Sequence, residues 1–296
     1  MRNLFLCVLA CLFGIYLQAQ EQRVFTFSMS GNQTSMSASN VPDQKEIGKA
    51  GMEFVYDYSY LSDTTDLASE TKDQMLLQVT YGMSKFTSYR GILVDSLLRV
   101  STADQIIANP ERYVVGQTFS LFKNYPAGKF TTTDRISTDW LSYEENIPMQ
   151  EWTIDDESAK EILGYQCRRA TCDFRGRKYI AWYSDEIPVA EGPWKFGGLP
   201  GLIMEVSDSE GHYKFALVGI NSKATRNINI ADIQYVKTTR DKFYSTKRKF
   251  DTDPVGYLQE VSGVALTITH EDGTPNLELM SPRELQYDYI ERDYKR

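Results

Sequence analysis

Apolar and polar residues alternate along most of residues 52–220, and this period of two is typical of strands with one buried and one wet face. Turn residues such as Arg175–Gly176 and Asp208–Gly211 separate the runs and predict hairpins. The pattern predicts a mainly β protein of the α+β class, with an antiparallel meander and peripheral helices. The clearest runs are MEFVYDYSYL (52–61), YQCRRATCDF (165–174), RKYIAWYS (177–184) and LIMEVSDSEGHYKFALVGI (202–220).

Four segments depart from this alternation and predict helical or irregular structure: 84–113, 155–164, 238–250 and 281–296. In 155–164, acidic residues at the start and Gly164 at the end are typical of a helical turn. The helix at 238–250 is predicted to begin with a capping box from Thr238 to Asp241. The last segment places Ser281 as N-cap, Pro282 at the first helical position and Glu284 two positions later, which predicts a C-terminal helix.

The first nineteen residues have the pattern of a secretory signal peptide. Arg2 supplies a positive charge, Leu4 to Leu17 form an apolar run, and Ala19 ends a small-residue cleavage site. The run is shorter than the roughly 20 apolar residues that a membrane span needs, and no other stretch of the sequence approaches that length. We therefore expect cleavage near Ala19 and an exported mature chain without a transmembrane segment.

The predicted organisation has four parts. The signal peptide at 1–19 precedes a polar leader with a short strand at 20–51. A β-rich domain follows at 52–237, and a helical or irregular C-terminal appendage occupies 238–296.

The net charge of the chain excludes one class of partner. With 32 basic and 40 acidic residues the net charge is −8, so nucleic acid is not an expected partner.

The four cysteines do not predict a disulfide. Cys7 and Cys11 leave with the signal peptide, which leaves Cys167 and Cys172 on one predicted strand. Five residues of strand span about 17 Å, and a disulfide needs Cα atoms within about 7 Å. Only a bulge at Arg168–Thr171 would bring the two thiols together, so we expect no bridge between them.

The segment GPWKFGGLPGLIMEV at 192–206 combines four glycines and two prolines with a heavy apolar load. Pro200 and Gly201 suit the two central positions of a type II turn. A strand follows the glycines instead of a helix, so a phosphate-binding loop is not indicated. The apolar side chains predict either a plug that folds over the sheet, which we favour, or the lining of an apolar pocket.

The hexapeptide Gly198–Leu199–Pro200–Gly201–Leu202–Ile203 resembles the GLPGLI family of exported bacterial proteins, which is named for it. Upstream residues fit the family pattern as well: Gly164–Tyr165, Cys167, Gly176–Arg177, Ala181–Trp182–Tyr183 and Glu186–Ile187–Pro188. The likeness extends over about Met52 to Lys237. It implies an envelope or secreted protein of a Gram-negative bacterium, in the periplasm or outside the cell. The family has no established activity, so no catalytic residue is carried over. The layout is also similar to periplasmic lipoprotein-carrier folds, which implies a curved antiparallel sheet or half-barrel.

The remaining candidates for chemistry are not specific. His212 and His270 lie in different segments and are not in a metal-binding pattern. The acidic groups Glu144–Glu145 and Asp155–Asp156–Glu157 could supply a carboxylate pair, although adjacent acids beside turns are usually solvated. A thiol or metal role for Cys167 and Cys172 is a third possibility. We expect no catalytic set, no metal and no cofactor.

The sequence thus predicts a non-enzymatic envelope protein, a carrier or adaptor for an apolar small molecule or an outer-membrane protein. Trp182, Trp194 and Phe196 are the candidate apolar lining. The alternative is a periplasmic hydrolase that uses a carboxylate pair.

Overall fold

The structure is a computed structural model that describes residues 41–263, 265–270 and 272–295. The predicted signal peptide, its cleavage site and the strand predicted near residue 25 lie outside the described residues. The described end of the predicted leader forms a strand, β1 (Gln44–Lys49), which pairs with β13 (Asn227–Ala231) in a separate two-stranded sheet.

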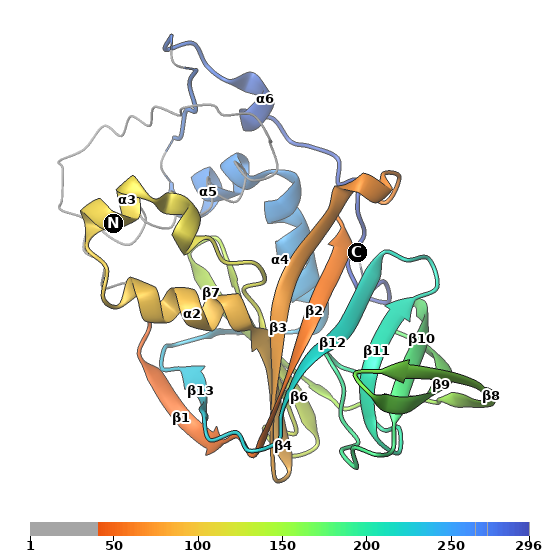
Figure 1. Cartoon of the computed structure of the whole chain (residues 1–296). Coiled ribbons are helices and arrows are strands. Elements are labelled where there is room, and N and C mark those ends of the chain that lie inside the picture. Colours follow the sequence, from red (N-terminus) through yellow and green to blue (C-terminus); the bar gives the residue numbers. More distant parts are fainter. Residues whose placement is uncertain (1–40, 264, 271, 296) are drawn as a thin grey trace.

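The main sheet has twelve strands in two sequential halves (Figure 1). The first half contains β2 (Met52–Leu61), β3 (Glu70–Thr80), β4 (Met83–Ser88), β5 (Ser120–Lys123), β6 (Lys129–Ile136) and β7 (Asp139–Asn146). The second half contains β8 (Thr153–Ile162), β9 (Tyr165–Phe174), β10 (Arg177–Ser184), β11 (Leu202–Asp208) and β12 (Tyr213–Asn221). The halves join where β12 pairs with β2, and β14 (Val236–Thr238) adds a short parallel strand beside β7. The predicted antiparallel meander is confirmed.

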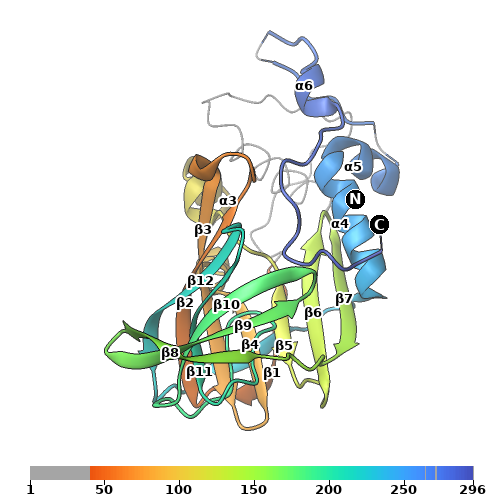
Figure 2. The ribbon, with the colours of Figure 1, turned by 90° about the vertical axis from the view of Figure 1, so that its right-hand side faces the viewer.

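The connection from β7 to β8 forces this sheet to curl. These strands are ten positions apart in the sheet order, which would be about 48 Å in a flat sheet. Only residues 147–152 join them, and that length of chain reaches about 25 Å at most. The edges must therefore approach each other, and in Figure 2 β8–β11 run at a steep angle to β6 and β7. The result is an open, strongly curved sheet, as predicted.

The inner face of the curved sheet carries the main core. Alternate residues of β2 point inward, so that Phe54, Tyr56 and Tyr58 are all buried while Asp57 is exposed. The same alternation buries Tyr179 and Tyr183 of β10. Other buried members include Met75, Leu77, Phe86, Tyr213, Phe215 and Leu217. The alternation in the sequence identifies these buried side chains, because one face of each strand is buried.

The helices lie at the margins of the sheet. α2 (Tyr89–Leu98) begins at Ser88, whose side chain accepts from the Gly91 N–H, and α3 (Ala103–Ala108) has a capping box. The remaining helices are α4 (Arg240–Thr252), α5 (Pro254–Ser262) and α6 (Leu277–Met280), with short 3-10 turns at Leu67–Ser69 and Pro110–Tyr113. The helix predicted at 238–250 is confirmed, but its N-cap is Thr239. Within the described part of the chain, none of these helices has the length and apolar character needed to cross a bilayer.

Two predicted helices are wrong. Residues 155–164 belong mostly to β8, which pairs with β9 and contains an irregularity between Asp155 and Ala159. There the Asp155 carboxylate accepts from the N–H groups of Glu157 and Ser158, so the acidic start stabilises a bulge and not a helix. Residues 281–295 form an extended strap, because most of their backbone and side-chain contacts are with the sheet and α4.

A second core joins the strap and helices to the sheet. Leu141 and Tyr143 of β7 pack with Phe243 and Tyr244 of α4 and with Tyr289 and Tyr294 of the strap. The Tyr143 and Phe243 ring centroids are 5.0 Å apart. Residues 238–295, predicted as an appendage, thus share hydrophobic contacts with the β-rich part.

Cys167 and Cys172 are both free thiols buried in the main core. Burial raises the pKa of Cys167 to about 11 and that of Cys172 to about 12, so both thiols stay protonated at neutral pH. The predicted lack of a disulfide between them is confirmed, and the protonated state disfavours a nucleophilic role.

We expect neither thiol to react with Ellman's reagent in the native mature protein within minutes, because the thiolate is the attacking form and both sulfurs are buried. In 6–8 M urea (about the usual unfolding range) both should react quickly, because unfolding removes the burial. Rapid labelling of the native protein would contradict the burial of these side chains.

Candidate functional site

The segment 192–201, which we call the plug, fills the opening left by the curl of the sheet. Trp194 and Phe196 point into the main core and are 4% and 0% exposed. The Phe196 ring lies 4.7 Å from the Tyr179 ring and 6.3 Å from the Trp152 ring, both measured between centroids. The plug therefore covers the sheet with aromatic side chains drawn from one loop.

Buried polar contacts fix the backbone of the plug. The Lys123 ammonium, on β5, donates to the Gly192 and Phe196 carbonyls at 2.8 and 2.5 Å and pairs with Glu191 at 3.0 Å. From the β7–β8 connection, the Gln150 amide donates to the Lys195 carbonyl, and the Trp152 indole donates to the Gly197 carbonyl at 2.9 Å. A loop without regular structure is thus held by side chains of β5 and of the β7–β8 connection.

The hexapeptide does not form the predicted type II turn. Gly201 has φ of +157°, and its N–H donates to the Leu199 carbonyl; the Leu202 N–H donates to Ile187 across the loop. The glycine is needed for another reason: a Cβ on Gly201 would lie 2.1 Å from the Ser184 carbonyl oxygen. The backbone of the plug passes directly against the end of β10, and no side chain fits between them.

Lys195 of the plug is the centre of a buried charge cluster. Its side chain is 1% exposed, and its ammonium pairs with Glu145 of β7 and with Glu291 of the strap. Glu291 is completely buried and also pairs with Arg240 of α4. Arg175, in the β9–β10 turn, approaches Glu291 at 3.6 Å and pairs with Glu145. We call these five residues the charge cluster.

The charge cluster keeps its groups ionised. Burial by itself would raise the pKa of Glu291, but Lys195 and Arg240 together lower it below the ordinary value of 4.5. Burial would likewise lower the pKa of Lys195, but Glu291, Tyr143 and Glu145 raise it. Each charge is tolerated in the interior because the opposite charges touch it.

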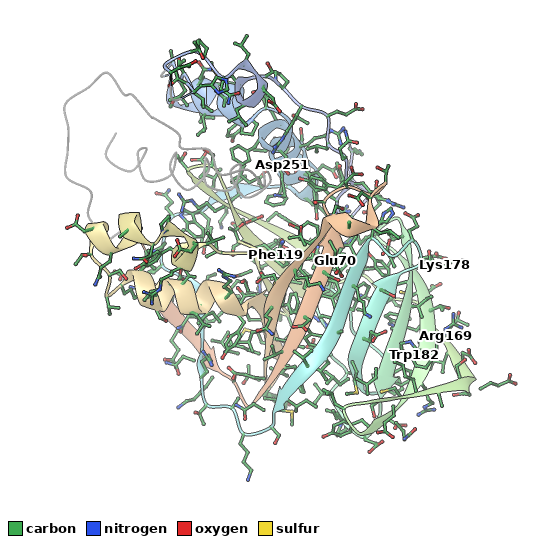
Figure 3. The ribbon with its side chains drawn as sticks, turned by 45° about the horizontal axis from the view of Figure 1, so that its top comes forward. Glu70, Phe119, Arg169, Lys178, Trp182 and Asp251 are labelled. Atoms are coloured by element: carbon green, nitrogen blue, oxygen red, sulfur yellow. The ribbon has the colours of Figure 1, made fainter. Side chains whose placement is uncertain are left out.

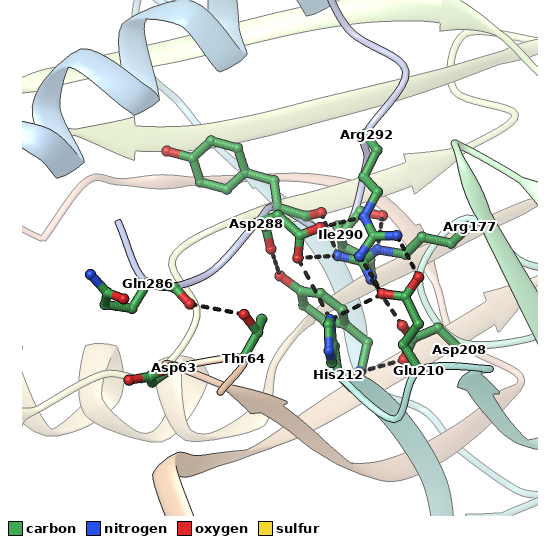
Figure 4. Close-up of polar contacts among 12 residues, drawn as sticks. Asp63, Thr64, Arg177, Asp208, Glu210, His212, Gln286, Asp288, Ile290 and Arg292 are labelled. Atoms are coloured by element: carbon green, nitrogen blue, oxygen red, sulfur yellow. Dashed lines mark hydrogen bonds and ion pairs between the residues drawn. The ribbon is translucent and has the colours of Figure 1, made fainter. Parts of the chain in front are cut away.

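A second ionic contact anchors the strap beside β10 (Figure 4). Arg177 is almost fully buried; it pairs with Asp208 at 2.9 Å and with Asp288 of the strap at 2.6 Å, and it donates to the Tyr289 carbonyl. The strap also crosses the β9–β10 turn so closely that a Cβ on Gly176 would lie 2.8 Å from Cβ of Arg292. The Arg292 N–H donates to the Arg175 carbonyl.

Asp208, Glu210 and His212 are close enough together to hold a metal ion. However, Arg177 pairs with Asp208, and Arg292 pairs with Glu210. Two guanidinium groups already neutralise these carboxylates and would repel a cation. The group is therefore better described as the ionic anchor of the strap than as a metal centre.

Between the sheet, α4 and the strap lies a cavity of about 450 Å³, with Asp251 on the α4 side and Phe119 toward the sheet (Figure 3). Aromatic side chains are the largest group in its walls, beside several polar and charged ones. The sheet contributes Tyr58, Tyr60, Tyr143, Tyr213 and Phe215, α4 contributes Phe243, Tyr244 and Phe250, and the strap contributes Tyr287 and Tyr289.

Four sheet side chains form a continuous aromatic platform in this cavity. Tyr58 stacks on Phe215 at 4.7 Å and on Tyr60 at 5.4 Å between centroids. Tyr213 stacks on Tyr60 at 6.2 Å. These residues face one another across the β2–β12 pair, at the point where the two halves of the sheet join. Aromatic faces arranged in this way can hold a flat or chain-like apolar molecule.

The predicted apolar lining is distributed over three places. Trp194 lines the cavity, whereas Phe196 lies behind it in the core. Trp182 is half-buried on β10, and the Lys160 ammonium lies 5.5 Å from its ring centroid. The hexapeptide Gly198–Ile203 forms the end of the plug and the start of β11 and is not part of the cavity wall.

The predicted carboxylates do not form a facing pair. Glu144 pairs with Lys129 at 3.4 Å on the exposed side of β7, while Glu145 belongs to the buried charge cluster. Asp155 caps the β8 bulge and pairs with Arg169. His270 lies in a turn near α6, where its N–H donates to the Thr274 carbonyl.

Sequence reasoning missed Lys123, Lys195 and Glu291, which hold the plug and the strap. Lys195 did carry a signal, because it is the one charged residue in a loop of aromatic, aliphatic and glycine residues. A single lysine in such a segment predicts a buried ion pair, but its partner Glu291 is 96 residues away and cannot be identified from sequence.

We expect Gly201→Ala to destabilise the fold by about 2 kcal/mol or more, because the new methyl group would overlap the Ser184 carbonyl. Gly211→Ala is the matched control, since Gly211 has a positive φ but open space around it, and it should cost about 1 kcal/mol. Urea denaturation of both variants measures the difference. Equal losses of stability in the two variants would show that the close contact between Gly201 and the Ser184 carbonyl does not explain the need for glycine.

We expect Glu291→Gln to lower the free energy of unfolding by about 3 kcal/mol at pH 7, because Lys195 and Arg240 lose their shared partner. The pKa of Glu291 is lowered by folding, so its stabilisation is present above its ordinary pKa of 4.5 and is lost as pH falls through the folded pKa. The difference in the free energy of unfolding between Glu291→Gln and wild type should therefore become smaller as the pH falls.

Glu284→Gln is the control, since Glu284 is an exposed residue of the same strap. It should change stability by less than about 0.5 kcal/mol. A Glu291→Gln protein as stable as wild type at pH 7 would rule out this role of the charge cluster.

The comparisons with known proteins match the region of the plug. Residues 175–205 match the family described as a protein of unknown function (Porph_ging), and no curated protein matches the chain. The chain is similar to two solved structures of PNGF-II, in the P21 and C2 space groups, each at 12% identity and a TM-score of 0.44. The matches cover 67% and 68% of this chain but 33% of each PNGF-II chain. The matched segment 175–205 contains the β9–β10 turn, β10 and the hexapeptide, so the resemblance predicted from sequence is confirmed: residues 175–205 match the Porph_ging, GLPGLI-type family, whose function is unknown.

Proposed function

We propose that this protein is an exported, non-enzymatic carrier that holds an apolar small molecule in the aromatic cavity. The observation that carries the proposal is the cavity itself. At about 450 Å³ it falls in the usual range for small-molecule sites, and its wall combines many aromatic side chains with a smaller number of polar and charged ones.

The construction of the wall supports a carrier over an adaptor. The sheet, α4 and the strap each contribute aromatic side chains to the same partly open space. An adaptor would use an exposed surface, but the large exposed apolar residues of the described chain, among them Tyr81, Val100 and Met149, are spread over several loops, strands and helices. The apolar area available for binding is therefore concentrated inside the molecule.

The hydrolase alternative receives less support. Two acids line the cavity, Asp134 and Asp251, but both are engaged. Asp251 accepts from the Tyr287 and Tyr289 hydroxyls, and Asp134 accepts from the Thr118 hydroxyl and the Arg135 N–H. These bonds hold structural elements together, as expected of supporting groups in a binding cavity.

Native mass spectrometry of the mature protein, purified gently from a Gram-negative periplasm, tests the proposal directly. A discrete adduct of a few hundred daltons, about the mass of a molecule that fits such a cavity, is expected. The neutral dye N-phenyl-1-naphthylamine should also bind with a stoichiometry of one. A bare mass together with no dye binding would remove the carrier proposal.

We expect Val115→Trp to weaken binding of this dye about tenfold, because Val115 lines the cavity and the larger ring would occupy part of it. Val114→Trp is the control, since the neighbouring side chain does not line the cavity, and it should change the dissociation constant less than about twofold. Fluorescence titration measures both. Equal effects of the two variants would place the dye elsewhere on the protein.

A further inference from the structure

The charged groups of the cavity come from α4, β6 and the strap. Lys247 and Asp251 lie one turn apart on α4, and Asp134 projects from β6. Arg135 and Arg283 also line this space. The charged residues of the wall are thus three cations and two acids, in a cavity whose remaining surface is mainly aromatic.

Lys247 has capacity to bind a further group. Its ammonium lies 3.6 Å from the nearest Asp251 oxygen, which is beyond hydrogen-bond distance, and 5.9 Å from the centroid of the Tyr289 ring. An ammonium has three hydrogen atoms to donate. The oxygen of Asp251 that it faces already accepts from the Tyr287 and Tyr289 hydroxyls at 3.0 and 2.8 Å.

Asp134 compensates this positive charge only in part. The carboxyl is 5% exposed, and one of its oxygens accepts both the Thr118 hydroxyl at 2.6 Å and the Arg135 N–H at 2.7 Å. Burial raises its pKa, although Lys247 and these bonds oppose that change. Asp134 therefore carries its negative charge less readily than an ordinary carboxylate.

A buried hydroxyl adds a second donor. Ser137, in the β6–β7 turn, also lines the cavity and is 4% exposed. Its hydroxyl has no hydrogen-bond partner among the described residues. A buried polar atom without a partner is costly unless a bound group satisfies it.

We propose that the cavity selects organic anions, that is, apolar molecules with one carboxylate or sulfonate group, which Lys247 binds while the apolar body lies on the Tyr58–Phe215 platform. This inference rests on the proposed carrier function and adds the charge of the ligand to it. An acidic head group would supply a further acceptor for the Lys247 ammonium, beside its ion pair with Asp251, and a charge-assisted hydrogen bond of this kind is stronger than a neutral one.

Two dyes with the same ring skeleton test the inference on the full mature protein. 8-Anilinonaphthalene-1-sulfonate carries a sulfonate, and N-phenyl-1-naphthylamine lacks it. We expect wild type to bind the sulfonate dye at least about tenfold more tightly, at a stoichiometry of one. Lys247→Met should remove this preference by weakening the sulfonate dye about tenfold, with less than about a twofold change for the neutral dye.

Two further variants serve as controls. Lys247→Arg keeps the positive charge and should retain the preference, whereas Lys242→Met removes an exposed charge from the same helix and should not affect it. Equal affinities of wild type for the two dyes, or a Lys247→Met protein that keeps the preference, would overturn the inference and leave the carrier proposal standing. Failure of both dyes to bind would overturn both.

Discussion

The buried carboxylate of Glu291 is the contact on which the arrangement around the plug depends. It is surrounded by Lys195 of the plug and Arg240 of α4, with Arg175 of the β9–β10 turn close by. None of these charges could be buried alone, because the loss of hydration would cost several kcal/mol for each ion. The four segments that carry them must therefore pack together or not at all. This requirement fixes the plug, the helix and the strap relative to the sheet, and so it also fixes three walls of the cavity.

A second constraint comes from chain connectivity. Because residues 147–152 are too few to join the edges of a flat sheet, the sheet must curl, and the curl leaves an opening that the plug fills. Gln150 and Trp152, in that same short connection, donate to the carbonyls of the plug. The role of the hexapeptide follows from this geometry. Gly201 lets the chain leave the plug directly against Ser184 and enter β11 in register with β10.

Local pattern predicted the strands well and the irregular parts poorly. The runs at 52–61, 165–174 and 177–184 became β2, β9 and β10, because period-two burial is a property of each strand by itself. The helix signals at Asp155 and Ser281 were real local preferences, but pairing with β9 and the ionic contacts of the strap outweighed them. Helix caps contribute about 1 kcal/mol, which is less than a set of buried tertiary contacts. Of the aromatic residues singled out in the sequence, Trp194 lies in the cavity wall, whereas the acids singled out there are not the ones that line it.

The sequence by itself determined the class of fold, the hairpins, the family segment and the burial of the aromatic loop, since each follows from neighbours within about ten residues. Only the tertiary structure decided where the cavity lies, that Lys195 pairs with Glu291, and that the C-terminal residues run as a strap instead of a helix. The physical reason is the separation in sequence of the residues that interact. Alternation, turns and caps are short-range interactions, whereas an ion pair between residues 96 positions apart exists only after the sheet has curled and brought the two segments together.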